Sequence, residues 1–196
     1  MKSPLSTEAL NQLFTEARTH NGWADTPVSD AQINQIYDLM KMGATSANCC
    51  PARLVFVRSD AAKAKLAALC DAGNDRKVLA APVTVIIGHD QEFAAKLGEL
   101  FPHDQTAPSW FEETQHRNTT AFRNGTLQGA YLMLAARAVG LDCGPMSGFD
   151  NAAVDAEFFA NTSIKSNFIC SIGVGTDERL FPRSPRLAFA DAASIL

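Results

Sequence analysis

Apolar residues recur at helical spacing in two segments near the start of the chain. The first segment begins at Ser6, and its apolar positions would form one buried stripe: Leu10, Leu13, Phe14 and Ala17. The second segment begins with Ser29 and Gln32, which form a capping box, and Gly43 can end it. Its predicted core face consists of Ile33, Ile36, Tyr37 and Met40. The pattern therefore predicts two amphipathic helices.

Short, predominantly apolar runs are typical of strands buried on both faces, and they occur at 54–57, 83–87 and 168–172. Helices are expected at 61–69, 91–100 and 150–159, and the longest helix at 118–139. The residues of this longest helix that we expect to face inward are Phe122, Tyr131, Leu134, Ala135 and Ala138. Gly125 and Gly129 lie four positions apart on it. This spacing predicts a face that another backbone or a subunit approaches closely, with a surface irregularity as the alternative.

Three segments lack such periodicity. Residues 101–117 would form a long loop, whose aromatic side chains either cover a ligand or pin the loop to the domain. Residues 142–150 combine glycines, a proline and a serine, which predicts a rigid loop with uncovered main-chain N–H groups or else an ordinary turn. The arm, residues 176–196, has little core-forming pattern and is expected to pack on something else, such as a partner subunit.

Helices outnumber strands, and the strands are short and separated by helices. This arrangement predicts an α+β or α/β sandwich with a buried central sheet, and we assign the chain to the α+β class. A chain of 196 residues is long enough for one well-buried domain and too short for two large ones. We therefore expect a single domain over residues 1–196.

Composition excludes several classes of function. The net charge is −4 and no basic stripe is present, which argues against a nucleic-acid partner. The five cysteines form no C-x-x-C pair, so neither a zinc site nor a disulfide framework is expected, and a reducing cytoplasm fits best. The N-terminus has no apolar targeting region, and charges or glycines interrupt the longest apolar runs. No signal peptide and no membrane span are expected.

Several catalytic motifs are also missing. The sequence has no G-x-x-x-x-G-K-[ST] phosphate loop, no H-E-x-x-H and no G-x-S-x-G. Gly173-Val174-Gly175 follows a predicted strand but lacks a third glycine and a following helix, so a Rossmann dinucleotide site is not expected. The four histidines have no helical ligand spacing, and no metal site is expected.

Residues at the two ends of the chain suit the phosphate of flavin mononucleotide (FMN). A dianionic phosphate is bound by guanidinium forks and by N–H or hydroxyl donors, which Arg18, His20 and Arg186 can supply. Arg18 has a structural alternative as a helix C-terminal charge, and Arg186 as a solvated arginine.

The flat flavin ring requires donors and acceptors at its edge. Thr45 and Asn48 can serve the pyrimidine end, and the Ser147 and Gly148 N–H groups can approach N5 and O4. Asn48 has an alternative role as a turn residue.

Four motifs in this order resemble the nitroreductase superfamily over essentially the whole chain: Arg18-Thr19-His20-Asn21, the segment 43–51, the segment 144–150, and 172–175 followed by 182–186. Within the superfamily, the sequence looks most like the HadB/RutE branch, which holds the malonic semialdehyde reductase of pyrimidine utilisation. Two positions depart from the usual pattern. Thr19-His20 stands for Arg-Ser, and Cys50-Pro51-Ala52 stands for Gln-Pro-Trp.

The resemblance implies an FMN-dependent oxidoreductase that uses NADPH or NADH and reduces a small electrophile by ping-pong hydride transfer through flavin N5. A semialdehyde, an enone and a nitro compound are the candidate substrates, and malonic semialdehyde is the specific one that the branch implies. A flavin-binding carrier or sensor without efficient turnover is the alternative. No side chain need act as acid or base, so no catalytic residue is assigned.

The resemblance further implies an intertwined homodimer, with each flavin at the subunit interface and the arm embracing the partner. The implied cofactor-binding residues are Arg18, His20 and Arg186 around the phosphate, Thr45 and Asn48 at the ring and ribityl side, Pro145, Met146, Ser147 and Gly148 at the N5 edge, and in addition Arg183.

Overall fold

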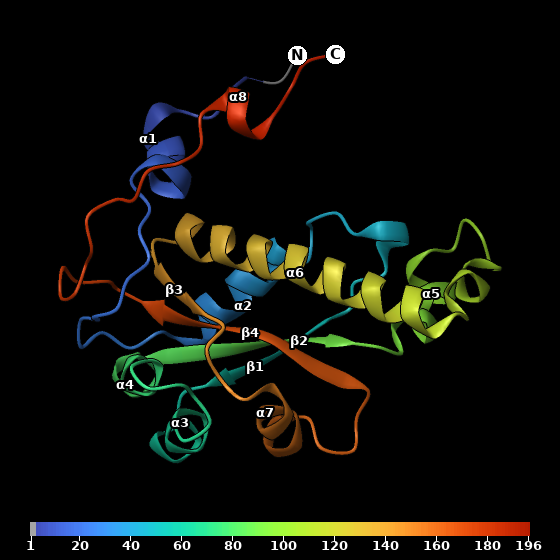
Figure 1. Cartoon of the computed structure of the whole chain (residues 1–196), viewed down its shortest axis with the longest axis horizontal. Helices are drawn as coiled ribbons and strands as arrows, with labels where there is room; N and C mark the ends of the chain where they lie inside the picture. The colour runs from blue at the N-terminus through green and yellow to red at the C-terminus, as the bar shows by residue number, and fades with distance from the viewer. Residues whose placement is uncertain (1–2) are drawn as a thin grey trace.

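The computed structural model describes residues 3–196 and shows a four-stranded sheet between two layers of helices (Figure 1). The strands are β1 (Ala52–Val57), β2 (Val83–Asp90), β3 (Asp142–Met146) and β4 (Ile164–Gly173). The helices are α1 (Thr7–Leu10), α2 (Asp30–Met40), α3 (Asp60–Ala67), α4 (Asn74–Ala80), α5 (Leu97–Leu100), α6 (Thr114–Ala138), α7 (Asn151–Phe158) and α8 (Phe189–Ala192). Segregated helices around an antiparallel sheet confirm the α+β prediction.

The sheet order is β1-β2-β4-β3, and every neighbouring pair is antiparallel. Successive side chains of a strand point to opposite faces. In β2, Val83, Val85 and Ile87 therefore pack into the core under α2 and α6, while Ile86 packs into the core on the other side. Burial on both faces explains why this strand is almost continuously apolar.

Helices α2 and α6 cover one face of the sheet, and α3, α4 and α7 cover the other (Figure 1). The start of α2 has the predicted capping box. The Gln32 N–H donates to Ser29 Oγ at 3.2 Å, and the Ser29 N–H donates to Gln32 Oε1 at 3.0 Å. These two bonds satisfy N–H groups that the helix itself leaves unpaired, so the sequence signal and the structure agree.

The buried face of α6 differs from the prediction. Of the five residues expected to face inward, only Ala135 is buried; Phe122 is 52% exposed, and Ala138 is exposed as well. The buried face is mostly small or polar: Thr120, Ala121, Asn124, Gly125, Gln128, Gly129, Leu132, Ala135 and Ala136. On α2, Tyr37 is likewise exposed rather than part of the core.

The two glycines of α6 do mark a close approach. A Cβ at Gly125 would lie 2.8 Å from His89 Cβ, and one at Gly129 would lie 2.5 Å from Phe168 Cζ. His89 belongs to β2 and Phe168 to β4, so the approaching element is the sheet of the same chain.

The rigid loop predicted at 142–150 is wrong for its first half, because Asp142–Met146 is strand β3, paired with β4. Proline is tolerated in β3 because this strand lies at the edge of the sheet. The His20 N–H donates to Cys143 O at 3.0 Å on the outer edge of β3, and strand alternation places the nitrogen of Pro145 on that same edge. The missing N–H of proline therefore leaves no sheet bond unmade.

Other segments also differ from expectation. Helices α4 and α8 have no counterpart in the sequence analysis, and α6 begins at Thr114 rather than at 118. Within 101–117, Phe111 packs with Phe93 in a small separate core. Phe111, with Phe101 packed against the same core, pins the segment to the domain, whereas Trp110 is 47% exposed.

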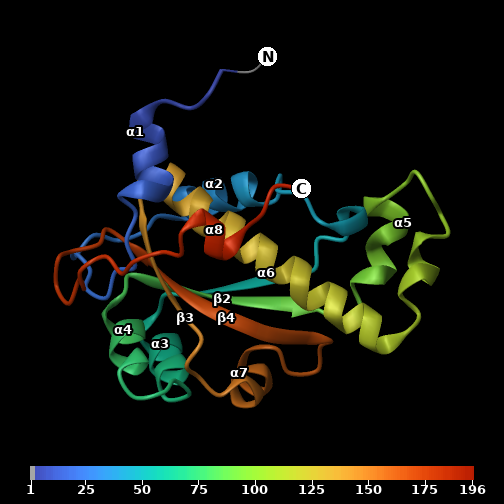
Figure 2. The same ribbon diagram turned by 45° about the horizontal axis from the view of Figure 1, so that its top comes forward.

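Helices α1 and α8 lie on the α6 side of the sheet (Figures 1 and 2). The N-terminal segment and the arm, to which they belong, carry exposed apolar side chains. Helix α1 continues into one π-helical segment, Asn11–Thr15, and neither contains a buried residue. The stripe predicted to be buried there is only partly covered within one chain: Leu13 and Ala17 are half-buried, whereas Leu10 is 42% and Phe14 54% exposed. No helix within residues 3–196 has the length and hydropathy needed to cross a bilayer.

Candidate functional site

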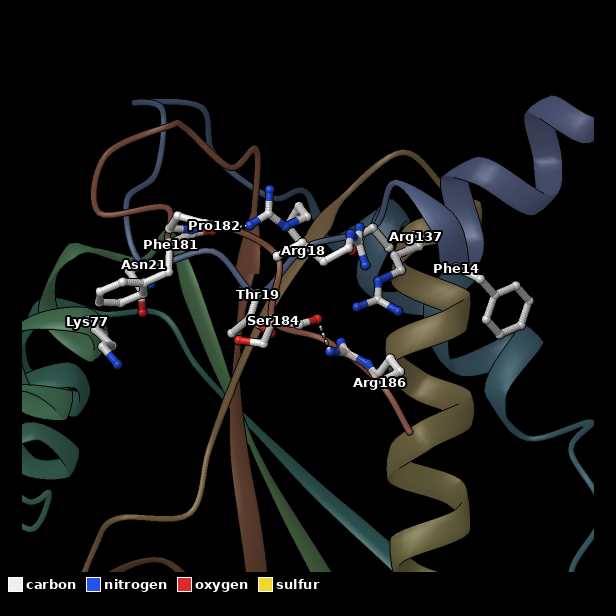
Figure 3. A pocket seen from close by; sticks show the side chains of 12 residues that line it. Phe14, Arg18, Thr19, Asn21, Lys77, Arg137, Phe181, Pro182, Ser184 and Arg186 are labelled. Carbon is white, nitrogen blue, oxygen red and sulfur yellow. Dashed lines mark hydrogen bonds between the residues drawn. The ribbon is translucent and has the colours of Figure 1, made fainter. Parts of the chain in front are cut away.

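The two ends of the chain enclose one cavity of about 540 Å³ (Figure 3). Its lining residues come from the N-terminal segment, α4, the last turn of α6 and the arm: Phe14, Ala17, Arg18, Thr19, Asn21, Lys77, Arg137, Phe181, Pro182, Arg183, Ser184 and Arg186. Figure 3 shows Arg18, Arg137 and Arg186 on one side of this cavity and Lys77 on the other. The cavity thus brings together Arg18, Arg183 and Arg186, the three arginines that the sequence analysis selected.

Backbone pairing holds these walls in place. Thr19 forms a parallel bridge with Cys143, which aligns the N-terminal segment along the outer edge of β3. The arm returns along the same segment, where the Arg18 guanidinium donates to Phe181 O and the Arg183 guanidinium donates to Ala17 O at 3.0 Å. The two arginines therefore cross-link the chain ends as well as lining the cavity.

The cavity is strongly positive. All its charged lining residues are basic, namely Arg18, Lys77, Arg137, Arg183 and Arg186, and within residues 3–196 none of them forms a salt bridge. Guanidinium groups without a carboxylate partner bind phosphate oxygens in bidentate geometry. This donor set fits a dianionic phosphate.

His20 lies beside the cavity but is not among its lining residues. Its Nδ1 is 3.1 Å from Thr176 O, and its Nε2 is 3.4 Å from Asp142 Oδ1. The ring fits tightly, since a Cβ at Gly175 would lie 2.3 Å from Nδ1. Both ring nitrogens already have partners in the chain, so the geometry gives His20 a role in holding the start of the arm against β3.

The segment 145–148 continues along β3 away from the arginines. Ser147 is exposed and Pro145 is half-buried, whereas the Met146 side chain packs in the core under α3 and α7. From Cys143, beside Thr19, to Ser147 the chain advances about 13 Å, at roughly 3.3 Å per residue. Gly148 has no space for a side chain, because a Cβ would lie 2.7 Å from Asn74 Nδ2. A ligand anchored at the arginines can therefore extend along this edge to Ser147.

Thr45 and Asn48 lie elsewhere. Their segment packs against the middle of α6 through Asn124, while Arg137 is at the C-terminal end of that helix. Arg137 follows Asn124 by thirteen positions, which correspond to about 20 Å along the helix. One chain therefore presents two separate groups of candidate cofactor ligands.

The profile of the nitroreductase family matches residues 14–176. The chain belongs to the nitroreductase family. Two relatives align over nearly their whole length: a protein of Ralstonia pickettii provisionally named NADH dehydrogenase/NAD(P)H nitroreductase HadB, 60% identical over 97% of this chain and 98% of its own, and one of Caulobacter sp. (strain K31), 59% identical over 98% of both. A provisionally named nitroreductase of Exiguobacterium sibiricum, solved in complex with FMN, has a TM-score of 0.86 at 20% identity, with all of both chains covered.

The family assignment makes this protein an oxidoreductase. At the candidate site of this nitroreductase-family chain, no residue stands out as an acid, base or nucleophile. Burial raises the pKa of the Cys49 thiol to about 11, so the thiol stays protonated at neutral pH. Burial also lowers the pKa of His89, which packs under α6 outside the cavity.

Sequence reasoning missed two cations of this nitroreductase-family site, Lys77 and Arg137. Lys77 lies on α4, a helix that no periodic pattern marks, and Arg137 reads as an ordinary charge in the last turn of α6. Only the tertiary fold places both in the wall of the same cavity as Arg18.

Proposed function

We propose that this chain is an FMN-dependent NAD(P)H oxidoreductase that holds the FMN phosphate in the cavity between the chain ends. The observation that carries the proposal is the set of five basic residues that line this cavity without salt-bridge partners in the described chain. Family membership and the FMN-bound structure of a similar fold support the choice of ligand.

When bound, FMN supplies the hydride chemistry. The side chains of this protein bind the cofactor and orient it. Arg18, Arg183 and Arg186 bind the phosphate, and Lys77 adds positive charge at the opposite wall. The part of the β3 edge beyond the Thr19 bridge to Cys143 directs the cofactor towards Ser147, whose N–H serves the N5 edge. His20 supports this site indirectly, by fixing the start of the arm.

The complete site requires two subunits. Thr45 and Asn48 pack near Asn124, about 20 Å along α6 from Arg137 at the phosphate cavity, so we propose that they serve the ring of an FMN whose phosphate the other subunit holds. The arm and the N-terminal segment expose apolar side chains that a second copy would cover, including Phe14, Leu187 at 75% and Phe189 at 63% exposed. We therefore propose a homodimer whose arms, residues 176–196, embrace the partner.

The proposed electron acceptor is a small electrophile, with malonic semialdehyde and its product 3-hydroxypropionate as the specific candidate pair. The provisional name HadB and the nitroreductase names of the relatives at about 60% identity support this branch of the family. Steady-state rates with malonic semialdehyde, an enone and a nitroaromatic compound test it. A kcat/KM for malonic semialdehyde below that for the nitroaromatic compound would reject the specific substrate and leave the oxidoreductase proposal standing.

The central experiment is a flavin titration of the purified protein. We expect FMN fluorescence to be quenched on binding, and NADH or NADPH to bleach the bound flavin rapidly under anaerobic conditions. Bound flavin that neither nucleotide reduces would favour the carrier or sensor alternative. If no flavin binds, the proposal is wrong. Light scattering on the same sample tests the dimer, and a monomer at micromolar concentration would contradict the two-subunit site.

A further inference from the structure

One face of α6 holds the segment 44–52 through three side chains. Asn124, Gln128 and Tyr131 are spaced four and three residues apart, so they point to the same side of the helix. Asn124 Oδ1 accepts from the Ser46 N–H at 2.9 Å, and Gln128 Oε1 accepts from the Ala52 N–H at 2.8 Å. The Tyr131 hydroxyl donates to Ala44 O at 3.0 Å. We call these three contacts the α6 brace.

The braced segment has an unusual backbone. Ala47, Asn48 and Cys50 have positive φ angles of 47°, 49° and 38°, in the left-handed region that residues with a Cβ rarely adopt. Such conformations persist only where the surroundings over-determine them, and they concentrate at binding and catalytic sites. Three of them within four residues mark this segment as one whose exact shape matters.

The brace acts on the main chain at both sides of the strained residues. Ser46 precedes them and Ala52 follows them, and the two amides that hold these N–H groups are almost fully buried, at 2% and 3% exposed. Inside the segment, Thr45 Oγ1 accepts from the Cys50 N–H at 3.2 Å, and Asn48 Nδ2 ties the segment to α5 by donating to Leu100 O at 2.9 Å. Because these buried side-chain amides form hydrogen bonds with main-chain groups of the segment, the segment is held in one defined shape.

We propose that Asn124 and Gln128 are positioning residues for flavin binding, which hold the Thr45–Cys50 segment in the shape that meets the ring side of the cofactor. This inference rests on the proposed function, in which Thr45 and Asn48 serve the flavin ring. It adds that residues of α6 without contact to the cofactor set the affinity for the isoalloxazine part of the ligand. Their contribution is therefore independent of the phosphate, which distinguishes them from the arginines of the cavity.

The test compares FMN with riboflavin, which lacks the phosphate, in the full-length protein. Gln128→Met and Asn124→Ala remove the acceptors, and each should weaken FMN and riboflavin by the same factor of about three- to tenfold. Gln128→Glu keeps an acceptor oxygen in either protonation state and should bind both ligands within about twofold of the unchanged protein. Thr126→Val is the matched control, because Thr126 on α6 accepts from Asn167 Nδ2 at 2.8 Å and does not touch the segment.

The melting temperature of the flavin-free protein separates positioning from simple stabilisation. Lower melting temperatures in Gln128→Met and Asn124→Ala with unchanged flavin affinity would overturn the inference, as would a loss confined to FMN. If Gln128→Met or Asn124→Ala fails to fold, Tyr131→Phe tests the same segment by removing only a hydroxyl. If Tyr131→Phe then binds FMN and riboflavin as tightly as the unchanged protein does, the result counts against the α6 brace. If the unchanged protein binds no flavin, the proposed function fails and this inference fails with it.

Discussion

Replacing Arg186 by alanine isolates the phosphate contribution to flavin binding. Arg186 is exposed, and among residues 3–196 its guanidinium donates only to the carbonyls of Ser184 and Pro185, two residues and one residue before it, at 2.8 and 3.2 Å. It therefore holds no distant segments together. Removing it should change the free energy of unfolding by no more than about 0.5 kcal/mol, as is usual for exposed positions without special contacts.

The loss in FMN affinity should be much larger than the loss in stability. A hydrogen bond between a guanidinium and a phosphate contributes about 1.5 to 3 kcal/mol, which corresponds to roughly ten- to 150-fold in affinity. Because Arg186 is exposed, solvent screening places the expected effect near the lower end, at about tenfold. Arg18 is half-buried and also donates to Phe181 O, so Arg18→Ala should cost at least as much in FMN affinity and additionally loosen the arm.

The assay is a fluorescence titration of each variant with FMN and with riboflavin. Arg179→Ala is the matched control, because Arg179 is an exposed arginine of the same arm that does not line the cavity, so this change removes the same charge. FMN binding should weaken in Arg186→Ala and stay within about twofold in Arg179→Ala, where only long-range electrostatics change. Riboflavin affinity should be the same in both variants.

Two results would refute the reasoning. Unchanged FMN affinity in Arg186→Ala would show that this arginine is only a solvated charge. Equal weakening of FMN and riboflavin would show that it supports the fold or the ring side, and the phosphate assignment of the cavity would then be wrong.

Two further predictions concern stability. Burial lowers the pKa of His89 despite the nearby Asp90 and Asp155 carboxylates, so the unfolded state binds more protons than the folded state around and below pH 6.5. The melting temperature of the unchanged protein should therefore fall between pH 7.5 and pH 5.5 by more than that of His89→Gln. Equal falls in the two proteins would contradict this account. Gly125→Ala should destabilise by about 1 to 3 kcal/mol, because its Cβ would lie 2.8 Å from His89 Cβ, which outweighs the gain of about 1 kcal/mol in helix propensity. Gly98→Ala, whose nearest neighbour would be 3.6 Å away, should be neutral or stabilising, and denaturant unfolding that ranked the two variants in the opposite order would refute the steric argument.

Local signals explain which elements were predictable. The Ser29 capping box lies within four consecutive residues, and a strand such as 83–87 is marked by a continuous run of mostly apolar residues. The inward face of α6 was not predictable by counting apolar residues, because the helix buries glycines and amides there instead. β3 was missed because Gly144 and Pro145 are turn residues in most contexts, and only the edge position in the sheet makes them acceptable.

The candidate site shows the same division at longer range. Arg18 and Arg186 could be selected from the sequence because a phosphate restricts the choice of side chains, whereas the sequence has no local pattern that joins Lys77 and Arg137 to them. These four cations line one cavity only because the segment around Thr19 lies along β3, the strand that follows α6, and because the arm returns along the same edge. A cavity built from both chain ends is sensitive to how the ends are held. Changes that free the arm should therefore weaken FMN binding even where they leave every cation in place.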